Sequence, residues 1–236
     1  MAEHEINGDL SKLAVVHTAD MAWQASPSPG VWRKRLDLSG PAEAGRVTSV
    51  VRYGADSRFR QHPHPDGEEI LVLEGVFSDE RGDYPAGTYL LNPESFSHAP
   101  FSRGGCVLFV KLRQYPGADR RQVTIDSKAA AWRDGEVPGL QVLELYGEAQ
   151  HPERIRMLRL EPGAVLESQV YLGGQEIFVL EGGLEGGLEV GLEGALENGE
   201  PSYRTGSWVR YPAGSRHALR SDGGCLFYEK TGHLTV

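Results

Sequence analysis

The segment HPHPDGEE, residues 62–69, holds the side chains of this sequence best suited to chemistry. His62 and His64 are two residues apart, so on a strand they point to the same face. Glu68 has the same parity, and the Pro-Asp-Gly before it predicts a tight bend that returns its carboxylate to the pair. His98 follows a predicted strand, TYLLN, and is a fourth donor. Three imidazoles and one carboxylate around one point favour a divalent transition metal.

The identity of the metal stays open at this stage. Four protein donors in a tetrahedron would complete a closed, structural zinc site. Six-coordinate iron, manganese or nickel would leave positions open for substrate, water or dioxygen. We therefore expect one divalent metal per chain, Fe(II), Zn(II), Mn(II) or Ni(II), with any catalysis at its open positions. A lone His-X-His pair is more often structural, and it is the added Glu and His that favour a metal.

An internal repeat surrounds this segment. EEILVLEG at 68–75 recurs as QEIFVLEG at 175–182, and GGCVLFVK at 104–111 recurs as GGCLFYEK at 223–230. The offset grows from 107 to 119 residues, so the second copy holds twelve extra residues. A repeat this long is not a solenoid unit and indicates two copies of one domain.

Both copies are predicted to be β-structure. Short apolar and β-branched runs alternate with turns, and the 30 Gly and 14 Pro suit many turns, so each copy is predicted to be an all-β sandwich or barrel. The expected organisation is an N-terminal segment packing on the barrel (1–45), a first domain with the metal site (46–118), a linker (119–140) and a second domain (141–236). The second domain includes a Gly/Leu/Glu insert at about 183–200, for which we favour a hairpin extension over a helix because of its glycines.

The second copy has lost the metal donors. The repeat offset maps the four donors of the first copy onto a different set: Gln169, Tyr171, Gln175 and His217. Gln and Tyr are poor ligands for divalent metals, so we predict a degenerate second site without an ion. These side chains would line a polar pocket, either for an organic ligand or for internal hydrogen bonds, or the second copy would serve as a scaffold for the first, which we favour.

Other residues of the first copy receive lesser interpretations. Tyr53, Tyr89 and Phe96 are candidates to line the pocket, and we favour Tyr89 for its wall because it precedes the second donor segment. Asp79 and Glu80 lie between the two donor segments, and we expect a solvated turn there.

The pattern HxHxxxExxxxxxG followed by GxxxxxPxxxxxH resembles the two cupin motifs. The residues that carry it are His62, His64, Glu68 and Gly75, then Gly87, Pro93 and His98. The resemblance covers both copies and implies a bicupin, two tandem double-stranded β-helix or jelly-roll barrels, with the metal in the mouth of the first. Glycines of the cupin pattern are replaced by Asp56 and Ser95, so we expect the turn geometry to differ there.

Finer features resemble the ChrR-type cupins, the metal-binding module of a class of anti-sigma factors. They are GEEILVLEGVFSDERGDYPAGTYLLNP at 67–93 and EKTGHL at 229–234. The sequence is also similar to cupin dioxygenases of the acetylacetone and dihydroxyacetophenone type, which implies cleavage of a carbon–carbon bond in a diketone or hydroxyketone.

Composition excludes several classes of function. The net charge is −9 with no basic cluster, which argues against nucleic acid as a partner. No apolar run is long enough for a membrane span, and MAEHEINGDL does not resemble a secretory signal. The two cysteines, Cys106 and Cys225, are predicted to be buried core thiols. We expect a cytoplasmic protein.

Two hypotheses of function follow, and both give the protein a small-molecule ligand. The first is a metal-dependent enzyme, with an Fe-dependent dioxygenase as the sharpest version. The second is a ChrR-like regulatory or stress-sensing cupin without turnover. A sigma-factor partner is disfavoured because no CxxC motif precedes the first copy. A structural or storage bicupin would not need the donor set, and a homodimer is compatible with either hypothesis.

Overall fold

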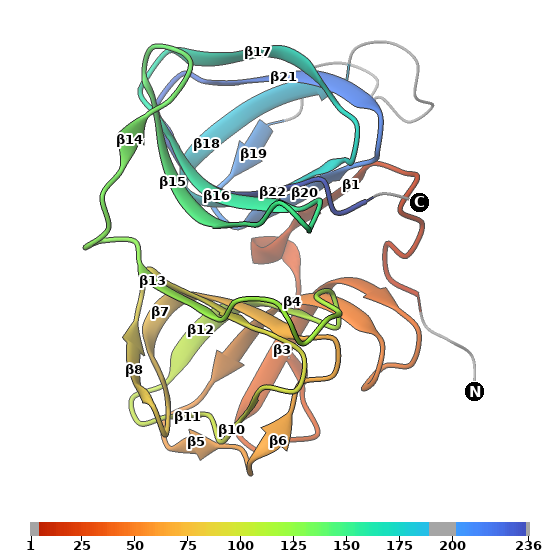
Figure 1. Cartoon of the computed structure of the whole chain (residues 1–236), viewed down its shortest axis with the longest axis vertical. Helices are drawn as coiled ribbons and strands as arrows, with labels where there is room; N and C mark the ends of the chain where they lie inside the picture. Colours follow the sequence, from red (N-terminus) through yellow and green to blue (C-terminus); the bar gives the residue numbers. More distant parts are fainter. Residues whose placement is uncertain (1–4, 189–201, 235–236) are drawn as a thin grey trace. The chain divides into compact units, whose positions relative to one another are not determined.

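The computed structural model describes residues 5–188 and 202–234, which form short antiparallel strands in two compact units (Figure 1). Unit 1 comprises the residues up to Gly8 together with Met21–Ala130. Unit 2 comprises Asp9–Asp20 and the chain from Ala131 onward. The predicted all-β class is confirmed. In the two described stretches, no helix has the length and apolar character that crossing a membrane requires.

Unit 1 contains one large sheet with the strand order β13-β9-β7-β12-β4-β3-β2, and smaller strand pairs that complete the barrel. Its strands are β2 (Gln24–Ala25), β3 (Val31–Ser39), β4 (Arg46–Tyr53), β5 (Ser57–Arg58), β6 (His62–Pro63), β7 (Glu68–Asp79), β8 (Gly82–Pro85), β9 (Thr88–Asn92), β10 (Ser97–His98), β11 (Phe101–Ser102), β12 (Cys106–Leu112) and β13 (Val123–Asp126).

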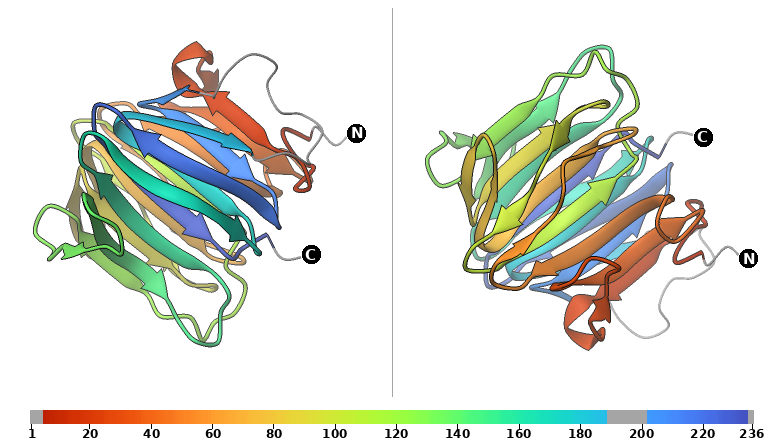
Figure 2. Two further views of the ribbon diagram at one scale, coloured as in Figure 1. Left: turned by 90° about the horizontal axis from the view of Figure 1, so that it is seen from above. Right: turned by 90° about the horizontal axis from the view of Figure 1, so that it is seen from below.

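Unit 2 repeats this design with the strand order β1-β20-β18-β22-β16-β15-β14, and β17 and β21 pair beside it. Its elements are β1 (Ala14–His17), a 3-10 turn (Thr18–Asp20), β14 (Arg133–Asp134), β15 (Leu140–Gly147), β16 (Arg154–Leu160), β17 (Ala164–Tyr171), β18 (Gln175–Leu188), β19 (Ser202–Arg204), β20 (Ser207–Tyr211), β21 (Ser215–Ser221) and β22 (Cys225–Thr231). Figure 2 shows the antiparallel strands running side by side.

The first strand of each repeat is exchanged. β1 precedes β2 and β3 in the chain, yet it pairs with β20 of unit 2, from Ala14↔Arg210 to His17↔Ser207. β13 precedes β14 and β15, yet it pairs with β9 of unit 1, from Val123↔Leu91 to Asp126↔Thr88. Each sheet therefore ends on a strand that the other repeat supplies.

The domain boundaries differ from those expected. The segment 1–45 contains β3, which pairs with β4 along its length and is part of the large sheet. The expected linker 119–140 contains β13 and β14, which pair with β9 and β15. β13 and β14, with four and two residues, are too short to show an alternating pattern, so the sequence did not reveal these two strands. Most of the expected insert, residues 189–200, lies outside the described residues, although Gly183–Glu185 pair with β19 as the start of a hairpin would.

A β-bulge lies at the same place in both repeats. The pairing of β7 with β12 passes over Leu73, and the pairing of β18 with β22 passes over Leu180. A glycine follows two residues later, Gly75 with φ 72° and Gly182 with φ 75°. A Cβ atom would lie 2.2 Å from a backbone oxygen at Gly75 and 2.1 Å at Gly182, so only glycine fits.

The bulge changes which residues face the core. Before it, Ile70 and Val72 belong to the core cluster of unit 1, and after it Phe77 does. The inward positions of β7 thus change from even to odd numbers.

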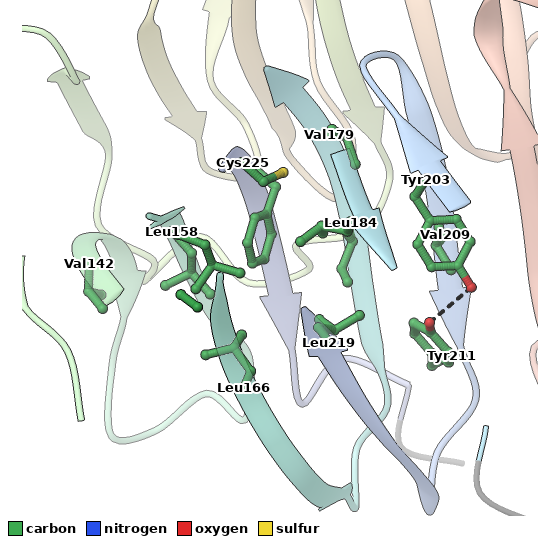
Figure 3. Close-up of a cluster of buried hydrophobic side chains, with 14 residues drawn as sticks. Val142, Leu158, Leu166, Val179, Leu184, Tyr203, Val209, Tyr211, Leu219 and Cys225 are labelled. Carbon is green, nitrogen blue, oxygen red and sulfur yellow. Dashed lines mark hydrogen bonds between the residues drawn. The ribbon is translucent and has the colours of Figure 1, made fainter. Parts of the chain in front are cut away.

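Each unit encloses its own apolar core. Figure 3 shows the cluster of unit 2, in which Leu184 and Leu219 pack among aromatic rings and the hydroxyls of Tyr203 and Tyr211 lie 3.0 Å apart in a hydrogen bond. Cys106 and Cys225 are free and buried, one in each cluster, which confirms the predicted core thiols. Burial raises the pKa of Cys106 to about 11 and that of Cys225 to about 12, so both remain thiols at neutral pH.

Candidate metal centre

Two short strands bring the predicted histidines together. β6 pairs with β10, and in this pairing His62 lies directly opposite His98. The backbone N–H of His64 donates to the carbonyl oxygen of Phe96 at 3.0 Å, which continues the alignment. Directly opposite residues of an antiparallel pair lie within side-chain contact, so this pairing gathers the three rings.

The predicted bend brings in the carboxylate. The N–H of Gly67 donates to the carbonyl of His64 at 3.2 Å, and Asp66 and Gly67 have φ of 52° and 72°. A Cβ atom at residue 67 would lie 2.9 Å from Cβ of Tyr115, so glycine is required there. The chain then enters β7 with Glu68 facing the histidines.

The donor atoms converge. One ring nitrogen from each of His62, His64 and His98 lies within 4.8 Å of the others, as in a group that could hold a metal ion. Nε2 of His64 and Nε2 of His98 are 2.9 Å apart, and Oε2 of Glu68 is 3.5 Å from each. Two nitrogens bound at right angles to one metal, at about 2.0–2.1 Å, are themselves about 2.9 Å apart. The donors therefore fit a transition metal in type, and His64 and His98 also fit it in spacing.

Hydrogen bonds orient two of the rings. Nδ1–H of His62 donates to the carbonyl oxygen of Arg60 at 2.8 Å, and Nδ1–H of His98 donates to Oδ2 of Asp79 at 3.2 Å. Each bond fixes the proton on Nδ1 and leaves Nε2 as a lone-pair donor. Carboxylate and carbonyl partners of this kind accompany metal-bound histidines in proteins.

Asp79 is the functional residue that the sequence interpretation missed, since we expected a solvated turn there. It is buried, and its Oδ1 accepts from the N–H of Arg81 at 2.7 Å and from the hydroxyl of Tyr84 at 3.1 Å. The bulge at Leu73 explains the error, because it turns odd-numbered residues inward. The following glycine, Gly75, is the signal in the sequence that could have shown it.

Burial sets the protonation of the donors. It lowers the pKa of His64 to about 4, with smaller electrostatic contributions from His62 and Arg113, and it also lowers the pKa of His98. Burial raises the pKa of Glu68. His64 and His98 are therefore neutral at pH 7, the form that binds metals.

A cavity of about 310 Å³ opens beside these donors inside unit 1. Its wall includes His62, His64 and Glu68 and a set of apolar side chains: Val31, Val47, Val51, Phe59, Ile70, Leu108, Val110 and Leu112. Ligand sites in proteins occupy about 300–1,000 Å³, so the cavity suits a small molecule.

Neither Tyr89 nor Phe96 lines this cavity, in contrast to our expectation. Leu90 belongs to the core cluster, so its neighbour Tyr89 points to the opposite face of β9. Phe96 packs its ring edge-on against His98, with centroids 5.3 Å apart. Tyr53, the third candidate, does line the cavity.

The comparison with protein families decides the classification. The sequence profile of the ChrR cupin-like domain matches residues 11–116 and again residues 120–235. The chain belongs to the ChrR cupin-like family. It is a bicupin, as the repeat and the two donor motifs predicted. No curated protein matches the sequence.

Solved bicupin structures share the fold. A candidate glyoxylate-induced protein from Pseudomonas aeruginosa is 11% identical, with a TM-score of 0.73 over 100% of this chain and 93% of its own. A candidate dioxygenase from Nostoc punctiforme is 14% identical, with a TM-score of 0.73 over 96% and 85%. A variant of oxalate decarboxylase from Bacillus subtilis is 14% identical, with a TM-score of 0.65 over 96% and 78%.

The two departures from the cupin glycine pattern keep glycine-like backbone geometry. Asp56 has φ 59° and Ser95 has φ 72°, both in the left-handed region. The expected change of turn geometry is therefore not seen in φ, which is positive at both positions. A side chain there costs about 1–2 kcal/mol relative to the ordinary conformation.

In the second cupin repeat, the four equivalent positions bond to one another and to neighbours. Nε2–H of His217 donates to Oε1 of Gln175 at 2.6 Å, and Nε2 of Gln175 donates to Oε1 of Glu229 at 2.7 Å. Nε2 of Gln169 donates to the hydroxyl of Tyr171 at 2.7 Å. In residues 5–188 and 202–234, no group of three metal donors occurs besides that of unit 1.

A second cavity, of about 290 Å³, lies in unit 2. Gln169 and Tyr171 line it, as the polar-pocket interpretation expected, whereas Gln175 and His217 do not. An ion pair, Arg156 Nε to Glu229 Oε2 at 2.8 Å, forms part of its wall.

Replacing Asp79 by Asn tests the orientation of His98. We expect D79N to weaken metal binding by about 10- to 100-fold, since the amide is a weaker acceptor for Nδ1–H of His98. The measurement is the dissociation constant of Mn(II) or Zn(II) by competition with a chromogenic chelator. D83N is the matched control, because Asp83 binds Ser78 on the same strand pair and does not contact His98. Equal affinity in D79N and the wild type would contradict the role of Asp79.

Replacing Ser95 by Gly tests the backbone strain in the second cupin motif. Ser95 is exposed with φ 72°, and glycine adopts this conformation freely. We expect S95G to raise the free energy of unfolding by about 0.5–1 kcal/mol, measured by urea denaturation. A55G, at an exposed residue whose φ is not positive, should lower it instead. A loss of stability in S95G would show that the turn is not strained.

Proposed function

We propose that this cupin is a metal-dependent enzyme acting on a small molecule in unit 1, an Fe(II)-dependent dioxygenase of the diketone or hydroxyketone type. The observation that carries the proposal is the convergence of three imidazoles and the carboxylate of Glu68 at the wall of a cavity. The inferred ligands of a single divalent metal are His62, His64, Glu68 and His98. Unit 2 serves as a scaffold and binds no metal.

An iron ion held there would supply a Lewis acid for a chelating substrate and reactivity toward dioxygen. The chain supplies the surroundings. Apolar side chains from β4, β7 and β12 form much of the cavity wall and limit the access of water. Arg60 and Asp79 hold the protons of His62 and His98 on Nδ1. Besides Glu68, the carboxylate of the wall is Glu43, which is paired with arginines, so no general base is assigned.

Two relatives in structure support the reaction class. One is described as a candidate dioxygenase, and another is an oxalate decarboxylase. The first name denotes the use of dioxygen, and the second denotes the decarboxylation of a small dicarboxylate. The alternative, a regulatory cupin that binds metal and ligand without turnover, has the same site and is separated by experiment.

The metal content of the purified protein tests the proposed centre. We expect about one divalent metal per chain, and we expect its loss in H98A because two donors and a carboxylate hold a metal poorly. H217A changes the equivalent histidine of unit 2 and should retain the metal, and H151A is a second control outside both cavities. Elemental analysis of the purified proteins measures the content, and circular dichroism checks their folding.

Removing the metal should destabilise the protein. A ligand present at 100 to 1,000 times its dissociation constant stabilises the folded state by about 3–4 kcal/mol. We therefore expect a chelator to lower the melting temperature of the wild type and of H217A but not that of H98A. A metal-free wild type, or equal metal content in H98A, would contradict the proposed centre.

Oxygen uptake tests whether the protein turns over a substrate. Iron-loaded wild type should consume oxygen with β-diketones or hydroxyacetophenones, followed with an oxygen electrode. H98A should show no uptake and H217A should retain it, because only the first histidine belongs to the centre. Full metal content without oxygen uptake across the panel would contradict the dioxygenase proposal and favour the regulatory alternative.

A further inference from the structure

Three arginines line the cavity of unit 1, and two of them share one carboxylate. Arg33 and Arg35 both contact the carboxylate of Glu43, with Nη1 of Arg33 at 2.9 Å from Oε2 and Nη2 of Arg35 at 3.0 Å from Oε1. Arginine binds a carboxylate through paired hydrogen bonds, and this arrangement occupies Glu43 on both sides. These two guanidinium groups are therefore not available without moving Glu43.

Arg113 differs from the other two. It lines the same cavity and is half-buried, and in the part of the chain that the structure describes no carboxylate or hydrogen-bond acceptor pairs with its side chain. Its charge reaches the metal centre, since it contributes to the lowered pKa of His64. A guanidinium at the wall of a cavity that has no carboxylate partner in the protein can pair with an anion that binds there.

The backbone holds Arg113 in place at a cost. Its φ is 60°, a conformation that disfavours a residue with a side chain by about 1–2 kcal/mol. Its N–H donates to the carbonyl oxygen of Gly67 at 3.2 Å, and the N–H of Tyr115 donates to that of Asp66 at 2.7 Å. The segment with Arg113 is thus fixed against the bend that carries the ligands His64 and Glu68.

The charges of the site favour an anion. Arg33, Arg35 and Glu43 together contribute one positive charge, and Arg113 contributes another. A divalent metal with Glu68 as a ligand would add one more positive charge. A low-dielectric cavity with this sign attracts a negatively charged substrate.

We propose that Arg113 determines specificity for a substrate that bears a carboxylate, a β-diketone or hydroxyketone acid whose carboxylate pairs with the Arg113 guanidinium. This inference rests on the proposed function, because the diketone or hydroxyketone part is assigned to the metal. Arg113 recognises the substrate and has no part in holding the metal.

A matched pair of probes tests the inference: 2,4-dioxopentanoate, a β-diketone acid, and its methyl ester, which lacks the charge. Binding to iron-loaded protein is measured by titration calorimetry without oxygen. We expect R113M to weaken binding of the acid by about 10- to 100-fold and to leave binding of the ester unchanged. R113K should retain part of the preference, because it keeps the charge but loses the paired geometry. R58M, at an exposed arginine outside the cavity wall, is the control and should match the wild type.

Metal content, measured on the same samples, separates two failures. If wild type and R113M hold the metal equally and the ratio of acid to ester affinity is unchanged in R113M, Arg113 does not recognise the carboxylate and the inference is overturned. If R113M loses the metal, Arg113 serves the centre itself, and the inference is also overturned. A wild type without metal would overturn the proposed function.

Discussion

Three imidazole nitrogens and one carboxylate oxygen lie close together at the wall of a cavity. Burial lowers the pKa of His64 and His98 and raises that of Glu68, so without a cation it disfavours the charged forms of these three groups. A shared metal would stabilise the four donors together, and other elements of unit 1 hold them in position. The β6–β10 pair sets two histidines opposite each other, the bend at Gly67 returns the carboxylate, and Asp79 orients one ring from behind. Unit 2 shows the other way to satisfy the same positions, with neutral side chains that bond to one another.

The two barrels differ in one cross-strand pair that alters their interiors. Ser49 and Val110 face each other across β4 and β12 and line the cavity of unit 1. The equivalent residues of unit 2, Arg156 and Glu229, are also paired across two strands and form an ion pair. Glu229 also accepts from Gln175, which holds His217, so the replacement of the metal donors and the arrival of this ion pair form a single connected network. Removing one member of this pair would leave the other charge without its partner.

Features of the fold and site that depend on neighbouring residues alone could be predicted from the sequence. The spacing of His62 and His64, the bend before Glu68 and the repeat offset each depend on a few neighbouring residues, and the structure brings the three histidines together. Features that depend on an element distant in the sequence could not be predicted. The bulge at Leu73 forms against β12 and moves Asp79 to the inner face, and the parity that removes Tyr89 from the cavity is set by the packing of Leu90. The exchanged strands β1 and β13 are four residues each, and their partners lie in the other repeat, so no pattern within either segment identifies them.

The exchange of β1 and β13 bears on the ancestry of the chain. A protein with only one of these repeats could complete its sheet by borrowing the first strand of a second molecule, which yields a twofold-symmetric swapped dimer. Gene duplication and fusion of such an ancestor would produce the present connectivity directly. After the fusion, only one of the two repeats would need to keep the metal donors, because every chain then contains both repeats. If the gene were cut between the repeats, each fragment would carry a first strand that pairs with the other repeat, and it would lack the strand that completes its own sheet.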